Sequence, residues 1–142
     1  MILLQLQEGG HASLVVTGNS MYPTLSHGRD TVFLQPVEGQ LQKGDLILYR
    51  RENGDYVLHR IVRCPSLNEW VCSGDNQWEP ERVCREQAVA KVYSFCRKGK
   101  EYAVTAQGYR CYVWLWVCLF PIRRPILAVR RFFGRLYRVV FK

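Results

Sequence analysis

Between His11 and about Tyr102 the chain is a succession of short β-branched and aliphatic runs, each closed within a few residues by glycine, proline or asparagine. Runs of this kind are typical of strands, and breaks at this frequency are typical of β-sandwiches and partly closed barrels. The predicted fold class is therefore mainly β. The expected strands cover residues 12–17, 31–34, 45–50, 56–63, 69–72 and 88–95.

Two of these runs are separated by a turn with Asn53 and Gly54 at its centre, which predicts a β-hairpin. On the return strand, the two-residue period of a strand places His59 and Arg60 on opposite faces. A lone histidine on an apolar face is usually a packed core residue. Because its charged neighbour points the other way, the face of His59 is also a candidate to line a cleft.

The charge of the chain is distributed unevenly. Up to Gln107 there are 12 basic and 12 acidic residues, whereas from Gly108 to Lys142 there are eight basic residues and no acidic ones. A neutral body argues against nucleic-acid binding by that body, and a basic tail indicates an anionic partner. We therefore divide the chain into a β-domain, residues 1–107, and a basic, hydrophobic tail, residues 108–142.

The tail opens with an uncharged stretch, Cys111–Ile122, whose 12 residues are fewer than the ~20 that a membrane-spanning helix needs. After it, apolar residues recur at the spacing of an amphipathic helix, and the arginines lie mainly off the apolar face. Pro125 falls near the expected helix start, where proline is tolerated. The apolar face comprises Ile122, Ile126, Val129, Phe133, Leu136 and Val140.

Three roles are open to this tail. It can lie on an anionic membrane surface, with Trp114 and Trp116 in an apolar anchor. It can instead cover the β-domain or a protein partner, or it can form a nucleic-acid-binding arm. We favour the membrane surface, because a purely structural helix rarely needs eight cations and no anion. The dense aliphatic and aromatic content disfavours nucleic acid.

The six cysteines include no Cys-x-x-Cys pair, which disfavours a zinc ribbon or a thioredoxin motif. Their loose spacing, and an opening MILLQLQEGG without the features of a signal peptide, favour reduced thiols. That opening segment is expected to form a short strand or helix leading into the core. We expect a peripheral membrane or cytoplasmic protein without a full transmembrane span. Three scattered histidines predict no metal site, and no other cofactor is expected.

Two polar turns follow predicted strands. The first contains Ser20, between Gly18, which lets the backbone approach closely, and Pro23, which stiffens the chain behind it. The second contains Asp75 and is followed by Asn76. Taken alone, each is more often an ordinary turn than a site, because serine and aspartate side chains commonly bond their own backbone.

In their order along the chain, however, these features resemble the type I signal peptidase family and its relatives in the S24 and S26 serine peptidases. The resemblance covers about Val15 to Val92. A Gly-Arg-Asp at residues 28–30 departs from the family's usual Gly-Asp by one inserted residue. The motifs that carry the resemblance are GNSMYP (18–23), KGDLILYR (43–50), VLHR (57–60) and SGDN (73–76).

The resemblance implies a compact signal-peptidase/LexA-like β-fold of small packed sheets, followed here by a C-terminal amphipathic helix. It implies that Ser20 is the nucleophile and His59 its general base, in the histidine form of the endoplasmic-reticulum and archaeal branch. Asp75 would orient or stabilise that histidine, and Asp45 would be structural. The implied activity is endoproteolytic removal of signal or leader peptides from precursor proteins or peptides.

The residues around Ser20 would form the oxyanion and substrate-binding part of the site. The backbone N–H of Ser20 would meet the oxyanion. Some relatives carry a hydroxyl residue two positions earlier, where this chain has Gly18, so Asn19 is considered as a substitute. Met21 and Pro23 complete this loop. A substrate would bind as an extended strand at a sheet edge, and activity would fall below about pH 6 as a histidine base protonates.

Two other functions compete with the peptidase. A non-catalytic module could keep the peptide groove and use the basic tail to tether a membrane or a partner. A self-cleaving repressor relative would share the Gly-x-Ser-Met motif, but it would need a DNA-binding domain that ten residues before His11 do not supply.

Overall fold

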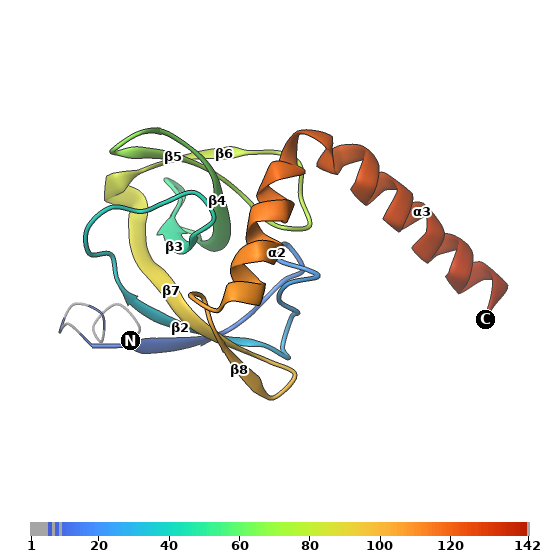
Figure 1. The fold of residues 1–142 in the computed structure, drawn as a ribbon, viewed down its shortest axis with the longest axis horizontal. Coiled ribbons are helices and arrows are strands. Elements are labelled where there is room, and N and C mark those ends of the chain that lie inside the picture. The colour runs from blue at the N-terminus through green and yellow to red at the C-terminus, as the bar shows by residue number, and fades with distance from the viewer. Residues whose placement is uncertain (1–5, 7, 9, 142) are drawn as a thin grey trace.

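The computed structural model describes Leu6, Glu8 and residues 10–141. In this part of the chain a curled antiparallel sheet of eight strands precedes two long helices (Figure 1). The mainly β prediction is therefore confirmed. The strands are β1 (Ala12–Val15), β2 (Thr31–Pro36), β3 (Leu46–Arg50), β4 (Tyr56–Ser66), β5 (Glu69–Ser73), β6 (Glu81–Cys84), β7 (Ala88–Arg97) and β8 (Lys100–Ala103).

The strand order in the sheet is β1-β2-β7-β3-β4-β5-β6, with β8 paired to β7. All six predicted strands are present. The sequence did not predict β6 and β8, because each has only four residues and neither contains an apolar run. The predicted hairpin joins β3 to β4, in a register that pairs Ile47 with His59 and Tyr49 with Val57.

Alternation along β3 and β4 gives each face of the sheet its own hydrophobic core. Leu46, Leu48 and Leu58 belong to one cluster, which also holds Met21 of the turn after β1. Ile47, Tyr49 and Ile61 belong to the other. The predicted separation of His59 from Arg60 follows this division, because the two residues are consecutive on β4. Both of these side chains are buried.

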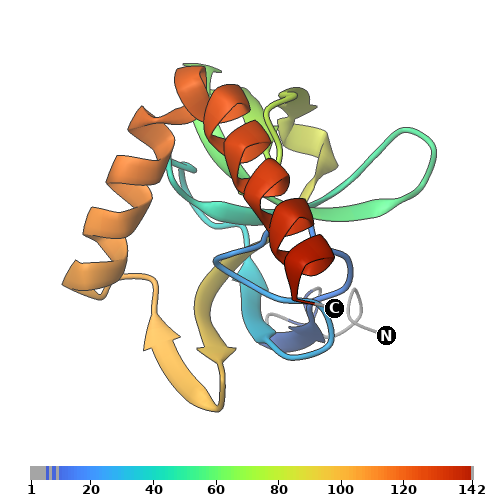
Figure 2. The same ribbon diagram turned by 90° about the vertical axis from the view of Figure 1, so that its right-hand side faces the viewer.

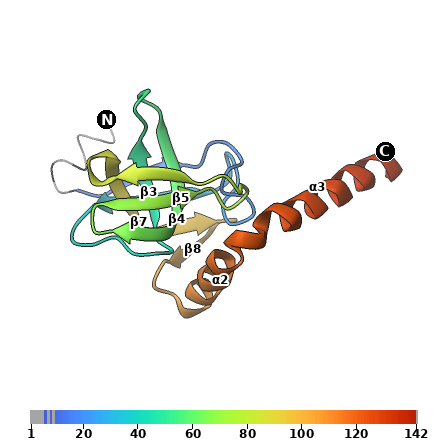
Figure 3. The same cartoon turned by 90° about the horizontal axis from the view of Figure 1, so that it is seen from above.

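The tail forms two helices, α2 (Gln107–Cys118) and α3 (Arg123–Val140), with 3₁₀ turns at η1 (Arg85–Gln87) and η2 (Phe120–Ile122). Pro121 lies in η2, where its missing N–H ends the α-helical hydrogen bonding. Helix α2 packs against the sheet domain through Val113 and Val117. Helix α3 corresponds to the predicted amphipathic helix and projects away from the domain (Figures 1 and 3).

Within the described residues, no single helix is long and apolar enough to cross a membrane. Only the pair formed by α2 and Phe120–Val140, bent by 54°, reaches that length and composition. The segment that we expected to be a short strand or helix lies mostly outside the described residues. Of its members, Leu6 is buried in the core that also contains Met21.

Candidate functional site

Ser20 lies in the turn that follows β1. Gly18 adopts a φ of 76°, in the left-handed region that favours glycine, and reverses the chain there. Met21 is 2% exposed and packs into the core, so the turn is anchored immediately after Ser20. Pro23 follows a cis peptide bond with Tyr22. The Ser20 side chain remains partly exposed on this anchored turn.

The turn after β5 holds the Ser20 turn from the other side. The Asn76 backbone N–H donates to the Ser20 carbonyl at 2.8 Å, and the Asn76 side-chain amide donates to the Asn19 carbonyl at 3.0 Å. Gly74 comes so close that an added Cβ would lie 2.5 Å from the Ser20 carbonyl oxygen. The predicted SGDN motif therefore fixes the backbone of Ser20.

Ser20 and His59 line the same pocket, which has a volume of about 360 Å³. Its walls come from β1, β3, β4 and the two turns, and include Leu14, Leu48 and Gln77. The Ser20 and His59 side chains are not joined by a hydrogen bond in the part of the chain that the structure describes. No lysine is among the described residues that line the pocket; its basic side chains are His59 and Arg51, and of the two only a histidine can act as a proton acceptor near neutral pH.

The His59 ring is held by a chain of hydrogen bonds. Tyr49 Oη lies 3.1 Å from His59 Nδ1 and donates its proton to Glu81 Oε2 at 2.9 Å. Since that proton is committed to the carboxylate, the tyrosine oxygen accepts from the Nδ1–H of the histidine. Arg51 holds the carboxylate through two hydrogen bonds of 2.8 Å. This assignment leaves His59 Nε2 unprotonated and available as a base.

The pKa values of this chain follow from burial and from the Arg51–Glu81 pair. The pKa of His59 is lowered to about 4, chiefly by burial, while Glu81 acts in the opposite direction and Arg51 adds to the lowering. The hydrogen bonds from Arg51 hold the pKa of Glu81 below its usual value. Burial raises the pKa of Tyr49. At neutral pH, His59 is therefore neutral and Glu81 is ionised.

Asp75, which the resemblance placed with the catalytic histidine, contacts other groups. Arg60 Nε and Nη2 donate to its two carboxylate oxygens, each at 2.8 Å, and the Thr24 hydroxyl donates to Oδ2 at 2.6 Å. The side chains of Arg60 and Asp75 are both fully buried. No hydrogen bond joins Asp75 to His59 among the described residues. The oxygen next to the His59 ring belongs to Tyr49.

Sequence reasoning did not identify Tyr49 and Glu81. Tyr49 was within reach of it, because the Asn53-Gly54 hairpin pairs Tyr49 with Val57 and so places it diagonally across from His59. Glu81 could not be identified from the sequence, because it lies on β6, a strand without an apolar run. That strand pairs with β5. The contact between Glu81 and Tyr49 depends on tertiary structure.

The oxyanion expectations can be compared with the backbone of the Ser20 turn. The Gly18 N–H is already bonded to the His27 ring at 2.8 Å. The backbone N–H of Ser20 has no acceptor among residues 10–141. Asn19 is exposed beside it. The turn therefore offers an unpaired backbone donor at Ser20 itself.

The sequence model of the family described as Peptidase S24-like matches residues 3–93. The chain belongs to the Peptidase S24-like family. Its fold is accordingly of the serine peptidase type. No curated protein matches the chain.

The S24-like match includes the Ser20 turn, His59, Asp75 and the Tyr49–Glu81 pair, and it ends within β7. Helices α2 and α3 lie outside it. The peptidase-like site and the basic tail are therefore separate parts of the chain, and only the first is covered by the family.

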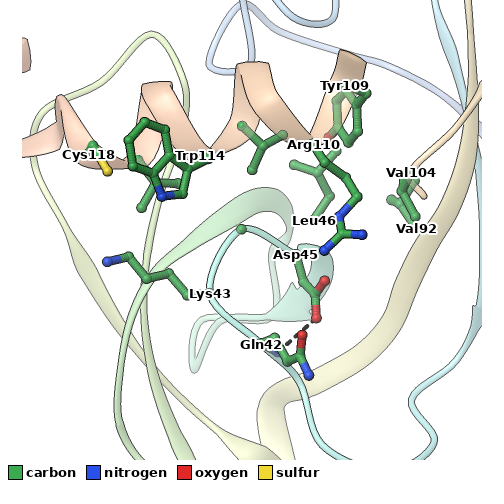
Figure 4. Close-up of a pocket in the computed structure, with 13 residues that line it drawn as sticks. Gln42, Lys43, Asp45, Leu46, Val92, Val104, Tyr109, Arg110, Trp114 and Cys118 are labelled. Carbon is green, nitrogen blue, oxygen red and sulfur yellow. Dashed lines mark hydrogen bonds between the residues drawn. The ribbon is translucent and has the colours of Figure 1, made fainter. Parts of the chain in front are cut away.

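A second pocket, of about 380 Å³, lies beneath α2 (Figure 4). It is lined by Tyr109, Trp114 and Cys118 of the helix and by the loop before β3. Asp45 in that loop accepts a hydrogen bond from the Gln42 N–H at 2.8 Å and pairs with Lys91 at 3.3 Å. Neither Ser20 nor His59 lines this pocket, so it is distinct from the candidate site.

Proposed function

We propose that the chain is a serine endopeptidase that cleaves signal or leader peptides from precursor proteins or peptides. Ser20 is the nucleophile and His59 is the general base. The observation that carries the proposal is the shared pocket, in which a partly exposed serine faces a buried, neutral histidine with a fixed tautomer. Membership of the S24-like family supports the same class of chemistry.

In the proposed mechanism, His59 Nε2 takes the proton of the Ser20 hydroxyl as the oxygen attacks the scissile carbonyl. The Ser20 N–H stabilises the resulting oxyanion. The imidazolium then gives its proton to the leaving amine, and water releases the acyl group by the same route in reverse. Closing of the Ser20–His59 distance on substrate binding is expected, because catalytic hydrogen bonds often tighten only in the complex.

Tyr49 and Glu81 act on His59 as positioning residues. The Tyr49 oxygen keeps the proton on Nδ1, which directs the basic lone pair to Nε2. The ionised Glu81 stabilises the positive charge that develops on the imidazole when it takes a proton. An acidic residue that orients a histidine is the logic of a catalytic triad, here with a tyrosine inserted between the two.

Two open strand edges support binding of an extended peptide. In the described chain β1 pairs only with β2, and β4 pairs with β5 only from Arg60 onward. Residues 56–59 therefore have one free edge, next to the pocket that they line together with Leu14 of β1. A substrate strand can bond to these backbone groups, with its side chains in the pocket.

The alternative is a non-catalytic peptide-binding module, which the lack of a direct Ser20–His59 hydrogen bond among the described residues favours. A fluorophosphonate probe distinguishes the two, because it labels only an activated serine. We expect labelling of the wild type, none for Ser20→Ala, little for His59→Ala, and wild-type labelling for the exposed control Ser66→Ala. Leader-peptide binding without any labelling or cleavage would establish the module instead.

A further inference from the structure

Helix α3 exposes a broad apolar surface. Its large side chains on this surface are between 48% and 77% exposed: Val129, Phe132, Phe133, Leu136, Val139 and Val140. At 3.6 residues per turn they lie within an arc of about 120°, roughly a third of the helix circumference. That is about the width of the apolar stripe with which an amphipathic helix packs against a partner, and here the stripe is exposed. Solvent-exposed apolar surface of this extent marks an interaction site.

The opposite side of α3 faces the sheet domain, and it does so with arginines. Arg123 is fully buried and donates to the Gly74 carbonyl at 3.2 Å. Arg130 lies over the ring of Tyr22 and bonds the Asn76 side chain, and Arg131 lies over the ring of Trp78 at 4.6 Å. In Figure 2, α3 crosses in front of the loop that contains Ser20. The domain therefore does not cover the apolar surface.

The positive charge of the tail indicates which partner covers the apolar surface of α3. The tail from Gly108 onward has eight basic residues and no acidic one. Arg124 and Arg135 border the apolar surface on the helix, and both are exposed. Two copies of α3 packed face to face would bring these like charges together without any acidic partner. An anionic bilayer satisfies both features, because its acyl region accepts the apolar side chains and its headgroups accept the arginines.

We propose that α3 binds an anionic lipid bilayer through this apolar surface. The first half of the helix stays bonded to the turns at Asn76 and Tyr22, so docking holds the Ser20–His59 pocket close to the membrane. Each basic residue near an anionic leaflet strengthens binding by about fivefold, and screening by ions makes the interaction dependent on salt. The inference concerns a surface outside the peptidase site and does not require activity.

The test is co-sedimentation of the full chain with phosphatidylcholine vesicles, with and without phosphatidylserine. We expect the chain to bind the vesicles that contain phosphatidylserine, and we expect this binding to weaken as the salt concentration is raised. Phe133→Ser with Leu136→Ser should weaken it at least tenfold, because each change removes a large apolar side chain from the acyl region. The matched control Leu67→Ser changes a residue that is 65% exposed on the sheet domain, and it should bind as the wild type does.

A second pair of variants tests the charges. Arg124→Gln with Arg135→Gln should weaken binding several-fold, whereas Lys43→Gln with Arg63→Gln, which removes two exposed cations from the domain, should not. Ser20→Ala should bind fully, so loss of catalysis and loss of docking are separable. The inference is overturned if the wild type binds neither vesicle, or if Phe133→Ser with Leu136→Ser instead abolishes self-association measured by size-exclusion chromatography.

Discussion

His59 differs from an ordinary histidine because it is buried. Its pKa of about 4 replaces the value near 6.5 on which the expected loss of activity below pH 6 rested. A general base must be unprotonated, so activity is lost only as the pH falls through the lower value. The rate of probe labelling of Ser20 should stay level from pH 7 to about pH 5 and halve near pH 4. A midpoint near pH 6.5 would contradict the buried geometry.

Tyr49 and Glu81 can be tested as positioning residues. Tyr49→Phe leaves the Nδ1–H of His59 without its acceptor, so labelling should slow by about tenfold to a hundredfold. Glu81→Gln removes the charge that raises the pKa of His59, so its acid midpoint should move below that of the wild type. Tyr102→Phe is the control, because the Tyr102 ring stacks on Phe95 and does not line the pocket of Ser20 and His59. An unchanged midpoint in Glu81→Gln would mean that the carboxylate is only structural.

The turn between β5 and β6 decides where Ser20 lies, through contact of backbone with backbone. Gly74→Ala places a Cβ 2.5 Å from the Ser20 carbonyl oxygen, so Ser20 must shift. Labelling should fall at least tenfold, with little change in circular dichroism. Gly108→Ala is the matched control, because a Cβ there meets nothing within 4 Å and alanine favours helix α2. Equal labelling of the two variants would show that the contact does not position Ser20.

The same turn is joined to β4 by the buried pair of Arg60 and Asp75. Asp75→Asn would leave the Arg60 guanidinium buried without its counter-charge, which costs about 3–5 kcal/mol. We expect a correspondingly lower free energy of unfolding in urea, whereas Asp55→Asn in the exposed hairpin turn should change it little. A purely catalytic Asp75 would give the opposite pattern, with stability kept and labelling lost.

These elements show which features the sequence could predict. Strands with apolar runs were found, and the two-residue period separated His59 from Arg60 correctly, because both signals are local. The neighbours of Asp75 could not be predicted from the sequence. They depend on how β4 pairs with β5 and on the contact with Thr24 from another turn. Glu81 was missed for the same reason. Its strand, β6, is defined by pairing with β5 and not by a local sequence pattern.

At the scale of the whole molecule, one arginine contacts both helices of the basic tail and the neutral S24-like domain. Arg123 lies between the rings of Trp116 and Phe120, with its guanidinium 4.9 Å from each ring centroid. It donates to the Trp116 carbonyl in α2 at 2.9 Å and to the Gly74 carbonyl beside Ser20 at 3.2 Å. A single side chain thus connects both helices to the turn that holds Ser20 in place.

Arg123→Met keeps the length of the side chain but leaves both carbonyls without their charged donor. Because hydrogen bonds from charged groups contribute about 1.5–3 kcal/mol each, the variant should lose several kcal/mol of stability. Amide hydrogen exchange should accelerate at residues 74–77 as well as in α2. Arg124→Met, its exposed neighbour, removes the same charge without these bonds and should leave exchange unchanged. Faster exchange in α2 alone would show that Arg123 does not support the Ser20 turn.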